Sequence, residues 1–220
     1  MTQLWSGRFD APPDDEVFEF QASFGFDRQL FEDDVTGSLA WAEALAGAGV
    51  LSRGEASVIR TALEEIRDRG RTDPSFVEGP DEDIHAFVER QLIERVGDAG
   101  KRLHTGRSRN EQVSLDLRLY LRRRTAGLQR ELVALVDALA GRAEAAGQVV
   151  MPSYTHLRRA QPILVAHYFV AHAVALRRDH RRLEIAREEA DALPLGSGAV
   201  AGASYPIDTA ALAEHLGFSR

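Results

Sequence analysis

The chain has 220 residues, of which 44% are hydrophobic and 28% are charged, and its formal net charge is −7. This composition predicts a globular protein with a sizeable core, and the negative charge argues against bulk attraction to nucleic acid or to an anionic membrane. The sequence contains no cysteine, which excludes disulfides and thiolate chemistry. No apolar run reaches the roughly 18 residues of a membrane span, and the first residues lack a secretion signal. We therefore expect a cytoplasmic protein with no nucleic-acid or membrane partner.

Two helices are predicted in the first third of the chain, after an irregular start. Residues 1–26 contain two prolines and several phenylalanines and show no helical period. A helical pattern then covers about residues 27–45. Ser52 and Glu55 have the spacing of a capping box, in which two side chains satisfy two free backbone N–H groups at a helix start. A second helix is therefore expected from Ser52 to about Gly70.

Three further helices, two of them very long, are predicted between residues 81 and 192. The first covers residues 81–97, between a proline and a glycine. The second begins at another capping box, Ser108 with Glu111, and its apolar residues recur at three- and four-residue steps over residues 108–146. It would be roughly 55 Å long at about 1.5 Å per residue. The third covers residues 162–192. Alternating strand patterns are nearly absent.

The tail of the chain is rich in glycine but does not read as a nucleotide-binding loop. Gly196, Gly198 and Gly202 follow no predicted strand, and no long helix opens directly from them. Asp208 is expected to cap a short last helix that ends at Gly217.

These patterns predict an all-α protein with two domains. Residues 1–104 would form a small helical N-terminal domain, and residues 105–220 an incomplete central domain of long helices. Such long helices with extended apolar faces cannot bury themselves within a compact monomer of this length, so we expect several chains to assemble.

The segment "HTGRSRNEQVS" (residues 104–114) gathers cations, hydroxyls and an amide at the start of a long helix. Backbone N–H groups and the helix dipole make such a position suitable for an anion. Asn110 is the candidate substrate contact, because an amide donates and accepts hydrogen bonds without adding charge. Ser108 and Arg109 are possible further contacts. In the alternative interpretation Ser108 and Glu111 only cap the helix, and both interpretations can hold.

A second candidate site is "YTHL", in the break between the two long helices. His156 can exchange protons near neutral pH, and Thr155 supplies a hydroxyl beside it. A lone histidine is nevertheless often structural, and His85 in "EDIHAF" is interpreted in that way. No His, Asp and Glu cluster has convincing metal-ligand spacing, so we expect neither a metal nor a cofactor.

Several motifs together resemble the argininosuccinate lyases of the fumarase/aspartase superfamily. They are "LWSGRF", "SFGFDRQLFEDDVTGSLAWAEAL", "EDIHAFVE", "HTGRSRNEQV", "MPSYTHLRRAQP" and "LGSGAVAGASYPID". The sequence departs from the usual pattern at Glu111, where the family has Asp, and at Trp41 and Ala203. Members of the family are roughly twice as long, and their third signature, a Gly-Ser-Ser loop, is absent here. The resemblance therefore implies that this chain is an N-terminal portion.

The resemblance implies reversible cleavage of argininosuccinate into arginine and fumarate, without a cofactor. It assigns acid/base catalysis to His156 and substrate binding to Ser23, Asn110 and Thr155. It also implies a homotetramer in which each active site collects residues from three chains. Because the second acid/base group of the family is a serine on the absent loop, we expect the 220-residue chain alone to be inactive.

Two other functions remain open from the sequence. The chain could belong to a sister lyase that acts on adenylosuccinate, aspartate or fumarate. It could also be a helical protein or fragment without catalytic activity. A panel of substrates followed by fumarate absorbance separates these alternatives.

Overall fold

The computed structural model describes residues 14–220, and the predicted irregular residues 1–13, including the "LWSGRF" motif, lie outside that part. The described chain separates into two compact units, one formed by the residues up to 120 together with 192–220, and the other by residues 121–191. The domain boundary expected near residue 104 falls inside the first unit and stays a prediction.

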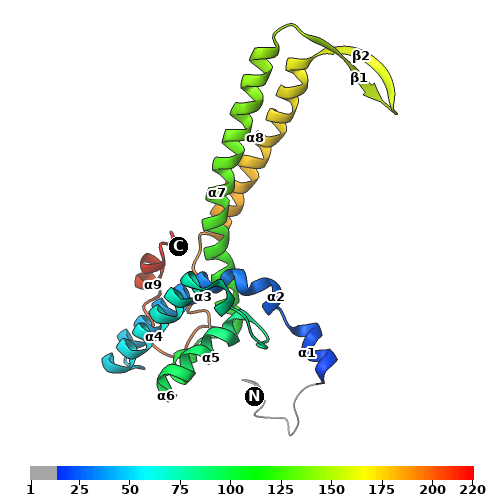
Figure 1. The fold of residues 1–220 in the computed structure, drawn as a ribbon. Coiled ribbons are helices and arrows are strands. Elements are labelled where there is room, and N and C mark those ends of the chain that lie inside the picture. Colours follow the sequence, from blue (N-terminus) through cyan, green and yellow to red (C-terminus); the bar gives the residue numbers. More distant parts are fainter. Residues whose placement is uncertain (1–13) are drawn as a thin grey trace. The chain divides into compact units, whose positions relative to one another are not determined.

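The described chain is helical apart from one hairpin (Figure 1). Its elements are α1 (Asp15–Gln21), α2 (Phe24–Asp27), η2 (Arg28–Leu30), α3 (Phe31–Gly47), α4 (Arg53–Thr72), η3 (Pro74–Phe76), α5 (Ile84–Val96), α6 (Asp98–Lys101), η4 (Arg102–His104), α7 (Arg109–Ala146), β1 (Val150–Thr155), β2 (Arg158–Leu164), α8 (Val165–Ala190) and α9 (Thr209–Leu216). The all-α prediction is confirmed. No described helix combines the length and the apolar character that crossing a bilayer requires.

Local capping signals place several helix ends of the first unit, among them those of α4 and α9. The Ser52 hydroxyl accepts from the Glu55 N–H, and the Glu55 carboxylate accepts from the Ser52 N–H, which confirms the predicted capping box of α4. Asp208 accepts from the Ala211 N–H at the start of α9, and Gly217 ends that helix with a φ of 70°. These ends could be predicted because each depends on residues at most four positions apart.

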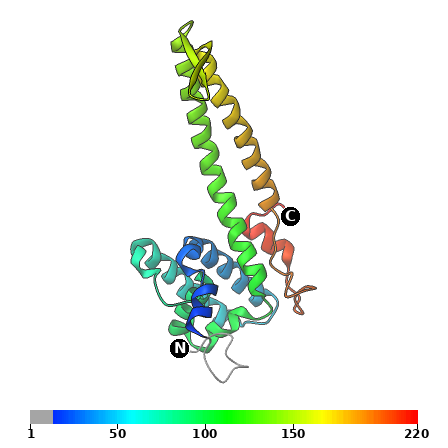
Figure 2. The same cartoon turned by 90° about the vertical axis from the view of Figure 1, so that its right-hand side faces the viewer.

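The core of the first unit joins both ends of the described chain. It is built mainly on α3, α4 and α5, and Trp41, Ile59 and Phe87 are almost fully buried in it. The C-terminal segment returns to the same core with four buried side chains, which are Leu195, Leu212, Leu216 and Phe218. Figure 2 shows α9 beside the helices of this unit. Burial of these side chains holds the segment that follows α8 against the N-terminal helices.

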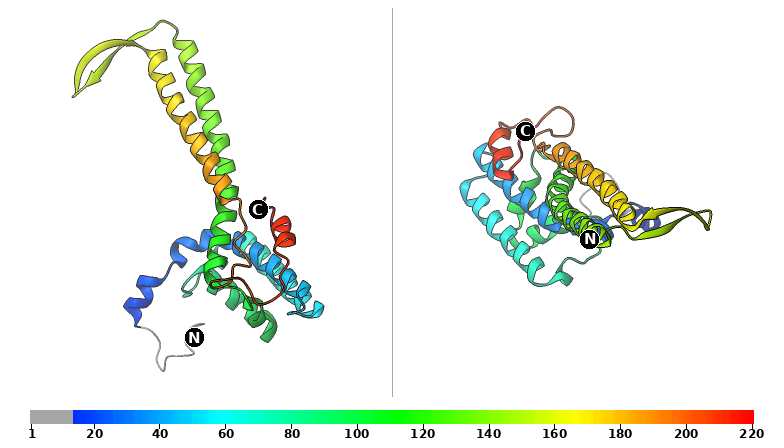
Figure 3. Two further views of the ribbon diagram at one scale, coloured as in Figure 1. Left: turned by 180° about the vertical axis from the view of Figure 1, so that it is seen from behind. Right: turned by 90° about the horizontal axis from the view of Figure 1, so that it is seen from above.

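The second unit contains residues 121–146 of α7, the strands β1 and β2, and helix α8. The two helical stretches run side by side in Figure 2 and in both views of Figure 3. Arg122 Nε and Asp191 Oδ1, at one end of this pair, lie 3.3 Å apart. Ala143 and Ala173 are buried within the unit, as expected where two helices approach closely.

The hairpin corrects two predictions. Strands β1 and β2 pair antiparallel from Val150 with Leu164 to Thr155 with Arg158, whereas the sequence analysis found almost no strand signal and placed a helix start at Pro162. Pro162 lies in β2, opposite Pro152, and α8 begins at residue 165. The pattern was missed because prolines and arginines interrupt the expected alternation, and both faces of β2 are largely exposed.

The start of the chain needs a similar correction. Residues 15–21, expected to be irregular, form α1, whose N-cap Asp14 accepts from the Glu16 N–H. The pattern that predicted one helix from residue 27 is divided in the structure among α2, η2 and α3.

Helix α3 approaches α7 closely at Gly37. A Cβ atom on Gly37 would lie 2.6 Å from Leu115 Cδ2, whereas a Cβ on Gly47, at the exposed end of the same helix, would meet nothing within 4 Å. Leu115 is completely buried, so its side chain has little room to move.

We expect Gly37→Ala to lower the free energy of unfolding by about 1–3 kcal/mol, because overpacking at Leu115 outweighs the gain in helix propensity. Gly47→Ala is the matched control and should leave stability unchanged or slightly higher. Urea unfolding of the two variants and the unmodified protein measures this. An equally stable Gly37→Ala variant would show that α3 and α7 do not touch there.

Candidate functional site

The entrance of α7 has the capped geometry that the sequence predicts, with one difference. The Ser108 N–H donates to Glu111 Oε1 at 2.8 Å, which is one half of the capping box. The Ser108 hydroxyl accepts from the Asn110 N–H at 3.3 Å and not from the N–H of Glu111. Asn110 is exposed in the first turn of α7, so its side chain stands at the positive end of the helix dipole.

The basic residues of this segment face internal partners. Arg107 is buried, and its Nη1 lies 3.3 Å from Ser38 Oγ. The guanidinium of Arg109 lies 3.8 Å from Asp83 Oδ1 and 3.7 Å from Glu89 Oε2. Two carboxylates therefore already lie near the positive charge of Arg109, which was predicted as a possible contact for a substrate anion.

Behind this entrance, three helices bring polar side chains together in the core. Each contributes a pair four residues apart, which places both members on one helix face. The pairs are Asp34 and Ser38 on α3, His85 and Glu89 on α5, and Gln112 and Asp116 on α7. A cavity of about 10 Å³, large enough for one water molecule, is lined by five of these six side chains and by His104 and Arg107.

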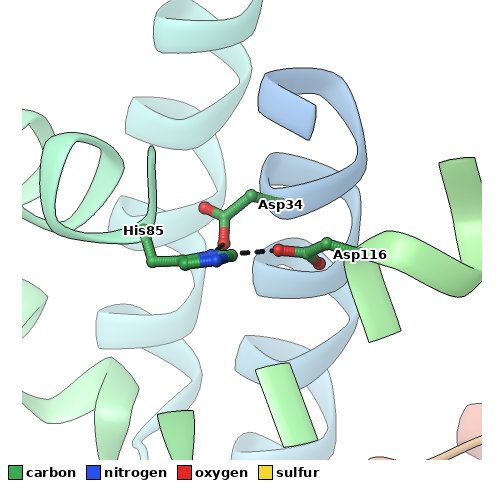
Figure 4. A group of neighbouring side chains, drawn as sticks. All are labelled: Asp34, His85 and Asp116. Atoms are coloured by element: carbon green, nitrogen blue, oxygen red, sulfur yellow. Dashed lines mark hydrogen bonds and ion pairs between the residues drawn. The ribbon is translucent and has the colours of Figure 1, made fainter. Parts of the chain in front are cut away.

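His85 is the centre of this polar cluster (Figure 4). Its Nδ1 lies 2.8 Å from Asp34 Oδ1 and 3.1 Å from Asp116 Oδ2. Gln112 Nε2 donates to the same Asp34 oxygen at 2.6 Å. The side chains of His85, Asp34 and Asp116 are at most 2% exposed, so water does not screen their charges.

The surroundings of the three groups shift their pKa values in different directions. Burial would lower the pKa of His85, but the interactions with Asp116 and Asp34 outweigh it and raise this pKa to about 10. Burial opposes ionisation of Asp34 as well, yet His85 and Arg107 lower its pKa to about 2. Burial and the charge of Asp34 raise the pKa of Asp116 well above its usual range. At neutral pH the cluster is an imidazolium beside one firmly ionised carboxylate and one that is hard to ionise.

The same three residues are the possible metal ligands of the described chain. One ligand atom from each of Asp34, His85 and Asp116 lies within 4.8 Å of the others, although the sequence analysis found no such cluster. A metal would have to displace the proton of His85 Nδ1, whose pKa is raised to about 10, so protons compete strongly at neutral pH. The ion-pair interpretation therefore describes this cluster better. The sequence feature that could have revealed this cluster is the pair of polar residues, four positions apart, on each of the three helices.

His104 differs from its basic neighbours. Burial and the charges of Arg107 and Arg109 lower the pKa of His104 to about 4, so this imidazole is neutral at pH 7. Of the basic residues in "HTGRSRN", His104 therefore carries no charge at pH 7.

The other predicted site residues lie in both units. Ser23, half-buried before α2, donates from Oγ to Asp27 Oδ2, and Asp27 Oδ1 accepts from the Ile84 N–H at 3.1 Å. Asp27 therefore links Ser23 to Ile84, the first residue of α5 and the neighbour of His85. Thr155 and His156 belong to the second unit, at the end of β1 and in the hairpin turn. Their approach to the α7 entrance stays a prediction.

We expect the two aspartates to respond differently to neutralisation. Asp34→Asn removes the charge that pairs with His85 and should lower the free energy of unfolding by about 3–5 kcal/mol. In Asp116→Asn, the new side chain resembles the protonated acid that the site favours. The loss in free energy of unfolding should therefore be clearly smaller than for Asp34→Asn. Urea unfolding of both variants at pH 7 makes the comparison. Equal losses, or a larger loss at Asp116, would contradict the assigned ionisation.

The raised pKa of His85 predicts instability in alkali. The folded state keeps a proton that the unfolded chain releases above pH 6.5, so this contribution to stability is complete below pH 6.5 and disappears as pH rises through about 10. Between these values the free energy of unfolding should fall by up to about 1.4 kcal/mol per pH unit. His85→Asn keeps a hydrogen-bond donor without a charge. This variant should be less stable at pH 7, and its free energy of unfolding should change less between pH 6.5 and about 10. Parallel pH profiles of the two proteins would refute the assignment.

Comparison with known proteins gives a consistent result for the whole chain. A family model described as "Lyase" matches residues 7–220. The argininosuccinate lyase of Solibacter usitatus is 46% identical over 218 residues, which are 98% of this chain and 47% of that protein. The argininosuccinate lyase of Geobacter sulfurreducens is 46% identical over 219 residues, with the same coverage. The chain thus spans about half the length of the curated relatives it matches.

Solved structures share the fold. An EDDS lyase variant with bound fumarate is 25% identical and superposes with a TM-score of 0.73, covering 93% of this chain and 40% of that one. The β-carboxy-cis,cis-muconate cycloisomerase of Acinetobacter calcoaceticus has a TM-score of 0.68 at 24% identity, covering 93% of this chain and 48% of that one. Since the family model extends over nearly every residue of the chain, the protein belongs to the lyase family.

Proposed function

We propose that this chain contributes to the active site of an argininosuccinate lyase, which reversibly splits argininosuccinate into arginine and fumarate. The observation that carries the proposal is identity of 44–46% to curated argininosuccinate lyases over 98% of the chain. We further place the reaction in arginine biosynthesis in the cytoplasm.

Cleavage of argininosuccinate requires that the negative charge of an intermediate is stabilised. A base removes the proton from the carbon beside a carboxylate, and the electron pair left on carbon spreads into that carboxylate. The electrons then form the double bond of fumarate as the C–N bond breaks, and the nitrogen leaves with the C–N electron pair and takes up a proton, which completes the guanidinium of arginine. Preorganised donors aimed at the charged carboxylate lower the barrier of such a step.

The entrance of α7 is suited to hold that carboxylate. It combines the exposed amide of Asn110, the hydroxyl of Ser108 and the positive end of a helix of 38 residues. Arg109 is a weaker candidate, because Asp83 and Glu89 lie near its guanidinium. Ser23 is proposed as a further substrate contact, with a hydroxyl that Asp27 orients.

The hairpin turn supplies the proposed acid/base group. His156 and Leu157 form the turn between β1 and β2, and both have positive φ, 50° and 61°. Two such residues are the signature of a tight hairpin turn that normally uses Asn and Gly. Bulky residues in this conformation are strained, and such strain is concentrated at functional sites. We propose that His156 exchanges the proton and that Thr155 binds substrate.

We propose a homotetramer in which each active site draws residues from three chains, without a cofactor. Of the candidate residues, Ser108 and Asn110 lie in the first unit, and Thr155 and His156 in the second. Exposed apolar residues along α7 and α8, among them Leu135 and Val174, offer surfaces for such an assembly.

A sister lyase is the second candidate. The likeness in fold to an EDDS lyase that holds fumarate supports a fumarate-releasing reaction on another substrate. Because its identity to this chain is 25%, against 46% for an argininosuccinate lyase, we rank argininosuccinate first among the proposed substrates.

The substrate proposal is tested by following fumarate absorbance. The chain is assayed alone and after mixing with the C-terminal half of the Geobacter sulfurreducens relative, with argininosuccinate, adenylosuccinate or aspartate. We expect fumarate from argininosuccinate in the mixture and little or none from the chain alone, because the chain spans only about half the length of the argininosuccinate lyases it matches. Faster turnover of another substrate would replace the proposal by the sister lyase. No fumarate in any combination would favour an inactive helical protein.

In the active preparation, His156→Ala should lower turnover by about 10²–10⁴, the usual effect of losing an acid/base group. His180→Ala is the control, because His180 lies on α8 beside Glu184 and outside the hairpin. Initial rates at saturating argininosuccinate give the comparison. Near-normal turnover of His156→Ala would remove this residue from the mechanism.

A further inference from the structure

Glu111 is buried and uses both carboxylate oxygens. Oε1 accepts from the Ser108 N–H at 2.8 Å, as a capping residue should. Oε2 accepts from the N–H groups of Gly196 and Gly198, each at 2.9 Å. The residue is 4% exposed. One carboxylate therefore joins the first turn of α7 to a segment 85 and 87 residues further along the chain.

The glycine-rich loop, residues 195–203, is shaped around this carboxylate. Gly196 and Gly198 have φ values of 100° and 62°, which glycine adopts without strain. A Cβ on Gly198 would lie 2.6 Å from the Gly202 carbonyl oxygen, and a Cβ on Gly196 would lie 2.5 Å from Thr209 Cγ2. The Gly202 N–H also donates to the Ser197 carbonyl at 2.7 Å. Only glycine lets the backbone turn two N–H groups toward one oxygen here.

These contacts exceed what a helix cap needs. Helix α4 has a capping glutamate at the same position, Glu55, which accepts from the Ser52 backbone and side chain and lies near Arg102. That glutamate contacts neither Gly196 nor Gly198. Hydrogen bonds from N–H groups to a buried carboxylate are stronger than those between neutral groups, and two of the three that Glu111 accepts from backbone N–H groups come from the loop.

We propose that Glu111 is a positioning residue whose carboxylate latches the glycine-rich loop to the entrance of α7, beside Ser108 and Asn110. Without this side chain, the N–H groups of Ser108, Gly196 and Gly198 form a binding site for a small carboxylate such as formate. The latch is a local property of the first unit, so it does not depend on the proposed lyase activity.

The unmodified protein gives the first test. Amide hydrogen exchange of residues 195–203 should be slower than in an unstructured chain, although Ser197, Ala199 and Val200 are exposed. Exchange at the rate of an unstructured chain would overturn the proposal whatever the variants do.

Removal and replacement of the carboxylate give the decisive test. In Glu111→Ala, exchange of the loop and of the first turn of α7 should rise at least about 10-fold, while α4 and α5 keep their protection. Sodium formate at increasing concentration should restore loop protection, and sodium chloride at the same ionic strength should not. Protection that formate does not change, in a variant that stays folded, would overturn the proposal.

Two further variants separate the latch from ordinary capping and from misfolding. Glu55→Ala removes a capping box without touching the loop, so loop exchange should stay unchanged with or without formate. Gly198→Ala disrupts the loop but leaves the carboxylate in place, so loop exchange should rise and formate should not reverse it. Should Glu111→Ala fail to fold, Glu111→Gln replaces it. This variant keeps the size of the side chain but not the charge, so its loop should exchange faster than in the unmodified protein, and equal protection would contradict the latch.

Discussion

The first unit depends on one buried ion-pair cluster. His85 on α5 lies between Asp34 on α3 and Asp116 on α7, and the three side chains are at most 2% exposed. A charge in such a place is unfavourable unless opposite charges and hydrogen bonds surround it. The contact between Asp34 and His85 needs α3 and α5, and the contacts of Asp116 and Gln112 need α7 as well, so the complete cluster forms only when all three helices are in register. Apolar packing alone tolerates small shifts between helices, whereas this cluster does not.

Contacts on two sides hold the entrance of α7 in place. On the inner side, Gln112 donates to Asp34 and Arg107 contacts Ser38. On the other side, Glu111 accepts from the glycine-rich loop, and the segment that carries this loop is held in the core by Leu195 and the residues of α9. A group presented at this entrance, such as the Asn110 amide, is thus supported by residues from both ends of the described chain.

The family relationship fits such a division between scaffold and site. Solved relatives at 25% identity or less keep the fold over more than 90% of this chain, so most of the sequence can change while the helices remain. They include enzymes named for different reactions, among them an EDDS lyase and a muconate cycloisomerase. One helical frame therefore supports several chemistries, and reaction type must be argued from the residues at its sites.

The sequence by itself predicted most of the longer helices and several of their ends, because capping and helical periodicity act between residues a few positions apart. Ser52 with Glu55 and Asp208 with Gly217 are examples. The sequence also carried the resemblance to the family, for instance in the motif around Asn110. Only the tertiary structure decided which polar groups meet. Asp34 and His85 are 51 residues apart, and Glu111 and Gly198 are 87 apart, so no local pattern links them. The hairpin that carries His156 was also decided there, because its strands are too exposed and too rich in proline and arginine to show an alternating apolar pattern.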